Sequence, residues 1–222
     1  MNFLTLCQTL RSEAGISGSG PATTVGQTGE LGRIVSWILQ AEQEIYDKRN
    51  DWGFLRDTFA FSANIGTSTY SRQVVSGLAE WKRDSFRIYS QAIGVIDETW
   101  LRWVPWELFR DTRLKGAVRL QTGRPIEFTI DPKKNVVLWP IPSDRYIVDG
   151  EFYSTAVTMI NDYDVPDFGR FHMVIVYNAL MRYAAWVNDP AVFANAQRNY
   201  GIQMSKLERE WAQEIVKGAS LA

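Results

Sequence analysis

The sequence predicts an α+β protein in which the N- and C-terminal segments form a helical bundle and a β-rich insert lies between them. Two observations support this fold class. Apolar residues recur at three- and four-residue steps over residues 28–48 and dominate residues 168–187, whereas they alternate with polar residues from about Arg56 to Thr158. Because 45% of the 222 residues are hydrophobic, the chain can bury a sizeable core. We therefore assign residues 1–56 and 159–222 to the bundle and residues 57–158 to an inserted domain.

The first element is expected to be a short amphipathic helix over residues 2–14. Its apolar side carries Cys7, the only cysteine, so no intramolecular disulfide can form and a buried core thiol is expected. The Gly- and Ser-rich stretch from Gly15 to Thr24 is typical of a loop. Its glycines follow a helix instead of a strand, which argues against a nucleotide-binding loop.

The second element is a helix over residues 28–48, whose apolar face recurs at helical spacing. Thr28 is expected to cap this helix with its hydroxyl, and Glu30 places negative charge in the first turn. The helix is expected to stop at Asn50-Asp51, directly before Trp52 and Phe54.

The middle of the chain shows the two-residue alternation of β-strands, and we expect six to eight of them. The predicted strands cover residues 58–62, 70–75, 86–89, 126–130, 135–139 and 146–153. Residues 103–111, with Pro105 early, predict one short helix.

The chain returns to helix after Pro166. Residues 168–187 are apolar nearly all round, so this helix must be buried, either at the centre of the protomer or partly against a neighbouring subunit. Asp189 and Pro190 are suited to start a further helix that runs to about Val216, with Gly218 as its C-cap.

No set of residues indicates catalysis, so we predict no enzyme activity, no catalytic residue, no cofactor and no metal site. His172 is the only histidine and is expected to be structural, and one Cys with one His cannot supply a zinc site. Asp162, Asp164 and Asp167 lack the spacing of a calcium loop and are expected in a loop and helix start. A net charge of −1 gives no electrostatic reason to bind DNA or a membrane surface.

Three tryptophans, Trp100, Trp103 and Trp106, would share one face if they lay on a helix. Such a group could form a sugar-stacking platform, although core packing or interface anchoring explains it better. It supports an alternative function, a β-sandwich carbohydrate- or receptor-binding module of a virion.

The helix at residues 28–48 and the aromatic segment after it resemble head–tail adaptor proteins of tailed bacteriophages, also called connector or head-completion proteins. The matching residues are Gly29, Glu30, Leu31, Arg33, Ile34, Val35, Trp37, Ala41, Ile45, Asp51, Trp52, Phe54, Leu55 and Arg56. The resemblance implies a homo-oligomeric ring, usually dodecameric, under the portal protein of the virion neck, assembled in the host cytoplasm. Such a ring would extend the DNA channel and dock the next neck or tail protein.

The resemblance also draws attention to aromatic residues beside apolar helix faces that a single protomer is not expected to cover fully. We expect subunit and portal contacts at Trp37, Trp52, Phe54, Trp186 and Trp211. Double-stranded DNA is expected to pass without specific binding, because 24 basic and 25 acidic residues suit a passage better than a clamp.

Overall fold

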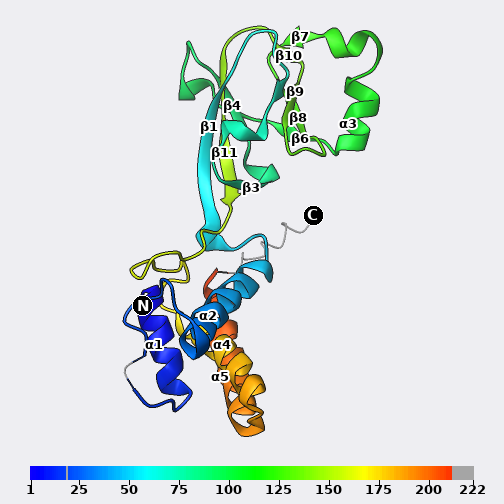
Figure 1. Cartoon of the computed structure of the whole chain (residues 1–222). Helices are drawn as coiled ribbons and strands as arrows, with labels where there is room; N and C mark the ends of the chain where they lie inside the picture. Colours follow the sequence, from blue (N-terminus) through cyan, green and yellow to red (C-terminus); the bar gives the residue numbers. More distant parts are fainter. Residues whose placement is uncertain (19, 212–222) are drawn as a thin grey trace. The chain divides into compact units, whose positions relative to one another are not determined.

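The computed structural model describes residues 1–18 and 20–211. The chain divides into two compact units (Figure 1). The helical unit contains Met1–Leu55 and the chain from Ala156 onward, and the β unit contains Arg56–Thr155. The predicted α+β class, with helices before and after a β-rich middle, is confirmed.

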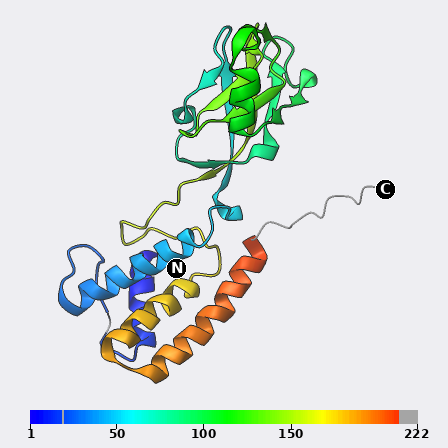
Figure 2. The ribbon, with the colours of Figure 1, turned by 90° about the vertical axis from the view of Figure 1, so that its right-hand side faces the viewer.

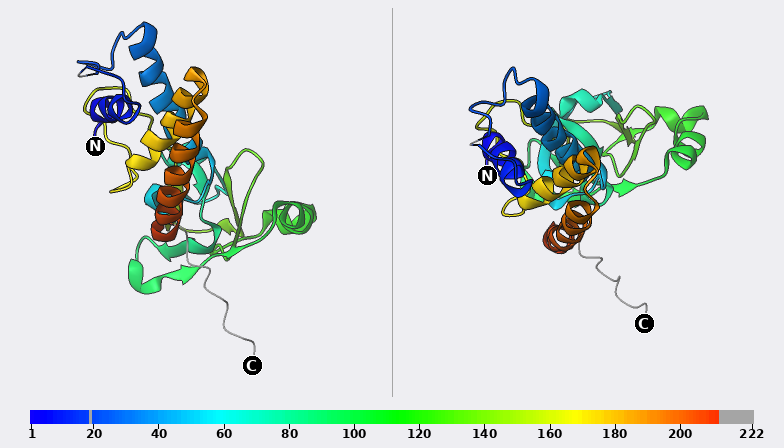
Figure 3. Two further views of the ribbon diagram at one scale, coloured as in Figure 1. Left: turned by 90° about the horizontal axis from the view of Figure 1, so that it is seen from below. Right: turned by 60° about the horizontal axis from the view of Figure 1, so that its bottom comes forward.

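The helical unit is built from four α-helices, α1 (Phe3–Glu13), α2 (Gly29–Asp47), α4 (Met173–Val187) and α5 (Pro190–Trp211), with a short 3-10 turn, η1, at Gly53–Leu55. Helix α4 contacts the other three, and Figures 2 and 3 show α4 beside α2 and α5. As predicted, α2 therefore packs on α4, the helix whose sequence is apolar nearly all round. The core comprises Leu6, Cys7, Ile34, Ile38, Ala41, Ile45, Val174, Ile175, Ala179 and Leu207.

The helix ends show where local chemistry differs from the sequence prediction. Thr28 is the N-cap of α2, but its side chain makes no capping hydrogen bond. The Thr28 carbonyl accepts the first hydrogen bond of the helix, 3.2 Å from the Gly32 amide. At the other end, α2 stops at Asp47, before the expected Asn50-Asp51.

Helix α4 begins at Met173 instead of residue 168, because Gly169 has a φ of +58°, which a right-handed helix does not allow. It ends at Val187, and its C-cap, Asn188, is left-handed with a φ of +57°. Asp189 then starts α5 as predicted, accepting hydrogen bonds of 3.0 Å from the amides of Ala191 and Val192. The expected end near Val216 and cap at Gly218 lie outside the described residues.

The β unit is organised around the long antiparallel pair β1 (Arg56–Ala63) and β11 (Tyr146–Ser154). Its main sheet adds β3 (Leu78–Trp81), β4 (Arg87–Ser90) and β5 (Thr99–Trp100). A second sheet contains β2 (Thr69–Tyr70), β9 (Val136–Trp139), β8 (Glu127–Ile130) and β6 (Arg102–Trp103). The pair β7 (Thr122–Gly123) and β10 (Ile141–Pro142) and the helix α3 (Trp106–Arg113) complete the unit.

Aromatic side chains fill the core of the β unit and join its two main sheets. Phe86 stacks on Phe128, with 4.1 Å between ring centroids, and Phe59 lies 4.8 Å from Trp81. One predicted strand, residues 70–75, is largely wrong. Only Tyr70 belongs to a strand, because Ser71 accepts a 3.2 Å hydrogen bond from the Gln73 amide and starts a 3-10 turn, η2, at Arg72–Val74.

Candidate functional site: two groups of aromatic residues

Two of the predicted interface residues lie together in what we call the exposed aromatic patch, formed by Arg33, Trp37, Tyr183 and Trp186 of α2 and α4. The Trp37 ring centroid lies 5.9 Å from that of Trp186 and 6.1 Å from that of Tyr183. The guanidinium of Arg33 covers the Trp186 ring at 4.6 Å. Half of the Trp186 side chain remains accessible (50%), although large apolar side chains are normally buried.

Helical spacing explains why this patch forms. Arg33 and Trp37 are four residues apart on α2, and Tyr183 and Trp186 are three apart on α4, so each pair shares a helix face. The two faces meet where α2 packs on α4. Tryptophan, tyrosine and arginine are the residue types that contribute most to binding at protein interfaces. The patch therefore has the composition of a protein contact surface.

The other predicted interface residues belong to what we call the buried aromatic cluster, formed by Tyr46, Trp52, Phe54, Phe168 and Trp211. Trp52 stacks on Phe54 at 5.3 Å, and Phe54 meets Trp211 edge to face at 5.7 Å. The Trp52 indole N–H donates a 3.1 Å hydrogen bond to the Ile45 carbonyl. Phe54 and Trp211 are half-buried, but Trp52 is completely inaccessible (0%).

Trp52 is therefore not an interface candidate, in contrast to the sequence prediction. Its indole is satisfied inside the fold and its ring offers no accessible surface. Close packing beside it needs Gly53, since a Cβ there would lie 3.1 Å from the Trp211 carbonyl oxygen. The cluster thus holds the segment after α2 against the last described turn of α5.

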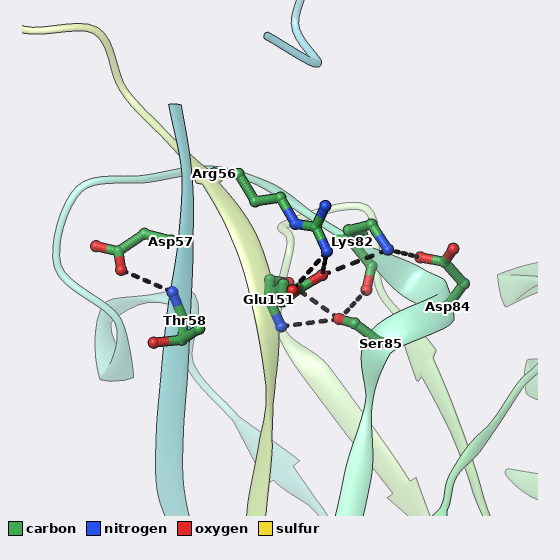
Figure 4. A network of polar contacts seen from close by, with 7 residues as sticks. All are labelled: Arg56, Asp57, Thr58, Lys82, Asp84, Ser85 and Glu151. Atoms are coloured by element: carbon green, nitrogen blue, oxygen red, sulfur yellow. Dashed lines mark hydrogen bonds and ion pairs between the residues drawn. The ribbon is translucent and has the colours of Figure 1, made fainter. Parts of the chain in front are cut away.

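In the β unit, a network of charged and polar groups lines a cleft of about 590 Å³ (Figure 4). The Glu151 carboxylate pairs with Arg56 and with Lys82, and Lys82 also reaches Asp84 at 2.9 Å. The Ser85 hydroxyl donates to the Lys82 carbonyl at 2.6 Å and accepts from the Glu151 amide at 2.8 Å. Each side chain in this network is engaged by a neighbour, and the arrangement contains no base beside a nucleophile.

The three tryptophans of the proposed sugar platform do not share a helix face. Trp100 lies in β5, Trp103 in β6, and only Trp106 belongs to α3. Arg87 covers Trp100 at 4.4 Å and Arg83 covers Trp103 at 5.0 Å. The arrangement on which the carbohydrate-binding alternative depended is therefore absent from the structure.

The remaining candidate groups occupy structural positions. Burial raises the pKa of the Cys7 thiol to about 12. His172 is buried, and its Nδ1 faces the terminal amine of Met1; burial and this amine lower the pKa of the imidazole. Asp162 accepts from the Thr24 amide at 2.6 Å and Asp164 from the Ile160 amide at 2.7 Å, so both shape a loop, not the start of a helix.

Neither a metal cluster nor a membrane span is visible in the part of the chain that the structure describes. The residues there form no group of three or more His, Cys, Asp or Glu side chains that could hold a metal ion. None of the described helices is long and apolar enough to cross a membrane.

Sequence reasoning missed an ionisable residue in the core of the helical unit. Glu42 lies on the buried side of α2, where its carboxylate accepts a 3.3 Å hydrogen bond from the Met159 amide. Burial is the main reason that its pKa rises to about 7, and the negative charges of Asp167 and Asp164 raise it further. Glu42 follows the buried Ala41 on an otherwise apolar face, and that position is the signal that could have identified it.

Comparison with known proteins agrees with the resemblance noted in the sequence. A search of curated proteins finds no match. The family model described as SU10 adaptor protein matches residues 1–218, which is nearly the whole chain. The chain therefore belongs to the SU10 adaptor protein family and is a bacteriophage head–tail adaptor.

Proposed function

We propose that the protein assembles as a homo-oligomeric ring, with twelve copies as in the type of adaptor it resembles, beneath the portal of the phage head. The ring would extend the DNA channel and dock the next neck or tail protein. Membership of the adaptor family supports a virion component that contacts other phage structural proteins. The observation that carries the finer proposal is the exposed aromatic patch.

The patch supports this proposal because its exposure has a cost in the isolated chain. A half-exposed tryptophan beside a second tryptophan and a tyrosine leaves apolar surface in water, and covering it would be favourable. Arg33 already lies over the Trp186 ring, so a partner carboxylate could add a charge-assisted hydrogen bond at the same place. A neighbouring copy or the portal would supply that cover.

The DNA channel requires weak contact with phosphate. Each neutralised phosphate adds salt-dependent affinity, so a basic lumen repeated around a ring would retain the DNA. The chain carries 24 basic and 25 acidic residues. We expect the lumen to be neutral or acidic. Filter binding to double-stranded DNA across salt concentrations tests this, and sub-micromolar affinity with a steep salt slope would contradict it.

The test of the proposed ring is native mass spectrometry of the full chain, alone and with its portal protein. We expect a ring with the portal and its loss in Trp186→Ala. Ile202→Ala is a matched control, because Ile202 is 49% accessible and Trp186 is 50% accessible, and both lie on helices of the same unit. Equal ring formation by both variants would show that the exposed aromatic patch does not form a contact needed for ring assembly.

We also propose that residues 57–158 behave as an inserted domain, whereas residues 1–56 and 159–222 fold together. The support is that the buried hydrophobic residues form separate cores, one within the helical unit and another within the β unit. Limited proteolysis followed by mass spectrometry should give a protected fragment close to residues 57–158. First cleavage inside β1 or β11 would contradict this division.

A further inference from the structure

Strand β1 lies at one edge of the main sheet of the β unit, and its outer side is open. The strand order of this sheet is β1-β11-β4-β5, and β11 is the only described strand that pairs with β1. Among the described residues, no main-chain group hydrogen bonds to β1 from its other side. Thr58, Ala60 and Ser62 are exposed. An edge strand of this kind carries a row of amide and carbonyl groups that can pair with another strand.

The hydrogen bonds around Thr58 show which main-chain groups of β1 point outward. Thr58 lies opposite Glu151 of β11. Its amide donates to the Asp57 carboxylate at 2.7 Å, on the side away from β11 (Figure 4). Glu151 also directs its main chain away from β1, since its carbonyl accepts a 3.1 Å hydrogen bond from the Lys82 amide. Hydrogen-bonding direction alternates along an antiparallel strand, so Ala60 likewise directs its amide and carbonyl outward.

This edge lacks the devices that normally prevent strand pairing. Natural sheets protect their edges with very short strands, prolines, charged side chains or bulges. Residues 58–63 read Thr-Phe-Ala-Phe-Ser-Ala, without charge or proline, and all eight residues of β1 pair with β11 in one continuous register. By contrast, the strands at the other ends of the two main sheets, β5, β2 and β6, are two residues long each. The long uncharged edge of β1 is therefore suited to the addition of a strand.

The order of the side chains identifies a second copy of β1 as the strand that fits. From Thr58 to Ser62 the strand reads Thr-Phe-Ala-Phe-Ser, which is symmetric in size and polarity about Ala60. If two copies pair antiparallel with Ala60 opposite Ala60, then Thr58 lies opposite Ser62 and Phe59 opposite Phe61. Hydroxyl groups meet on the exposed face and aromatic rings on the core face, and both kinds of cross-strand pair are favourable. This register also brings outward-pointing residues together, as antiparallel hydrogen bonds require.

We propose that two copies of this chain pair through β1, antiparallel about a two-fold axis at Ala60, and thereby join their main sheets. The charged start of the strand does not oppose this register, because Asp57 then lies opposite Ala63 of the second copy. A two-fold contact is self-complementary, so it joins two copies and recruits no further ones. The contact lies in the β unit and does not use the exposed aromatic patch. It therefore goes beyond the proposed ring and describes the protein before the portal is present.

The first test is sedimentation equilibrium of the full chain without the portal protein, with Ala60→Pro and Ala60→Val as variants. Proline removes the outward N–H, and the fold tolerates it because that N–H does not bond to β11. Valine is the matched control, since it keeps the N–H and favours strands. We expect dimers of the wild-type chain and of Ala60→Val. The dissociation constant of Ala60→Pro should be at least about tenfold higher, because two hydrogen bonds across the axis are lost.

The second test is disulfide cross-linking of Ala60→Cys, which does not depend on how well the proline variant folds. In the proposed pair the two Cα atoms at this position lie about 5.5 Å apart, within the reach of a disulfide. Thr58→Cys is the control, because it is exposed on the same face but its two copies would lie roughly 13 Å apart along the strands. The native Cys7 is buried and its thiol has a pKa of about 12, so it does not compete for oxidation. We expect reducible dimers from Ala60→Cys alone.

A wild-type chain that stays monomeric over a hundredfold range of concentration would overturn the pairing. So would dimers of equal affinity in Ala60→Pro and Ala60→Val, or equal cross-linking of Ala60→Cys and Thr58→Cys. A monomeric chain whose Ala60→Pro variant no longer binds a neck protein would also overturn it, and would assign this edge to a strand of that protein. Trp186→Ala should leave the dimer unchanged while it removes the proposed ring, so the two proposals fail separately.

Discussion

The exposed aromatic patch and the buried aromatic cluster use the same residue types at the two ends of the same helical core. In the patch, Trp186 is half accessible and meets Trp37 across two helices. In the cluster, Trp52 is inaccessible and its indole donates to Ile45. The cluster closes the fold of the helical unit, whereas the patch leaves apolar surface accessible among the described residues of that unit, and we propose that another protein covers it.

This difference shows that an aromatic residue beside an apolar helix face is not by itself an interface residue. The deciding factor is whether another segment of the same chain covers the aromatic side chain. The segment after α2 folds back over α2 and places Trp52 under Phe54. At the far end of α4, Asn188 and Asp189 turn the chain directly into α5, and Trp186 stays exposed.

The largest expected effect on stability comes from a change in the buried aromatic cluster. Trp52→Ala should lower the free energy of unfolding by about 3–5 kcal/mol, because it leaves a cavity and removes a satisfied hydrogen bond. Urea unfolding measures this loss. A change below about 1 kcal/mol would show that the cluster does not hold the fold.

The second largest expected effect is a pH dependence of the free energy of unfolding that comes from Glu42, which is buried one turn before Tyr46 of the buried aromatic cluster. Its pKa is about 7 in the folded protein and 4.5 when unperturbed. A carboxyl whose pKa is raised by folding stabilises the protein most at low pH, and that stability falls as pH rises from about 4.5 to 7. The loss should be of the order of 3 kcal/mol.

Glu42→Gln should remove this pH dependence, because an amide cannot ionise. The variant should match the wild-type protein near pH 4.5 and exceed it at pH 8. The measurement is urea unfolding of both proteins across this range, compared as a difference so that other titrating groups cancel. Parallel curves for the two proteins would show that Glu42 ionises normally in the fold.

On the exposed side, Trp186→Ala should change stability by less than about 1.5 kcal/mol, since half of the side chain is already in water. It should nevertheless abolish ring formation with the portal. Thermal unfolding and native mass spectrometry on the same sample separate the two effects. A large fall in melting temperature would show that Trp186, like Trp52, stabilises the fold of the single chain.

The smallest expected effect is the contact of Arg33 with the Trp186 ring. A double-mutant cycle with Arg33→Met and Trp186→Ala should give a coupling of about 0.5–1 kcal/mol in the isolated chain. The cycle repeated on the portal-bound protein should give a larger coupling, because the partner removes water from the pair. Equal couplings in the two states would indicate that nothing covers the patch.

Periodicity was sufficient to predict the helices and the longest strands, because their apolar faces repeat over many residues. The run from Leu31 to Ile45 predicts both α2 and its contact with α4. Short elements depend on single side chains instead. Gly169 delays α4, and Ser71 converts a predicted strand into a 3-10 turn.

Burial was harder to predict than secondary structure. Trp52 and Trp186 look alike in sequence, since each lies beside the end of an apolar helix, and only the three-dimensional path of the chain separates them. Ile93, Val95 and Ile96 were missed for the same reason. The run Ile93-Gly94-Val95-Ile96 does not reveal that these side chains are exposed on a loop, which Arg124, far along the sequence, fixes by hydrogen bonds to Asp97.

The most direct test of the proposed function is cryo-electron microscopy of the virion neck. We predict a ring of this chain beneath the portal, with Trp37 and Trp186 buried against another protein and Trp52 packed as in the single chain. DNA should cross the ring without ordered contacts to its wall. A neck in which the chain forms no ring, or in which Trp186 faces solvent in every copy, would contradict the proposal.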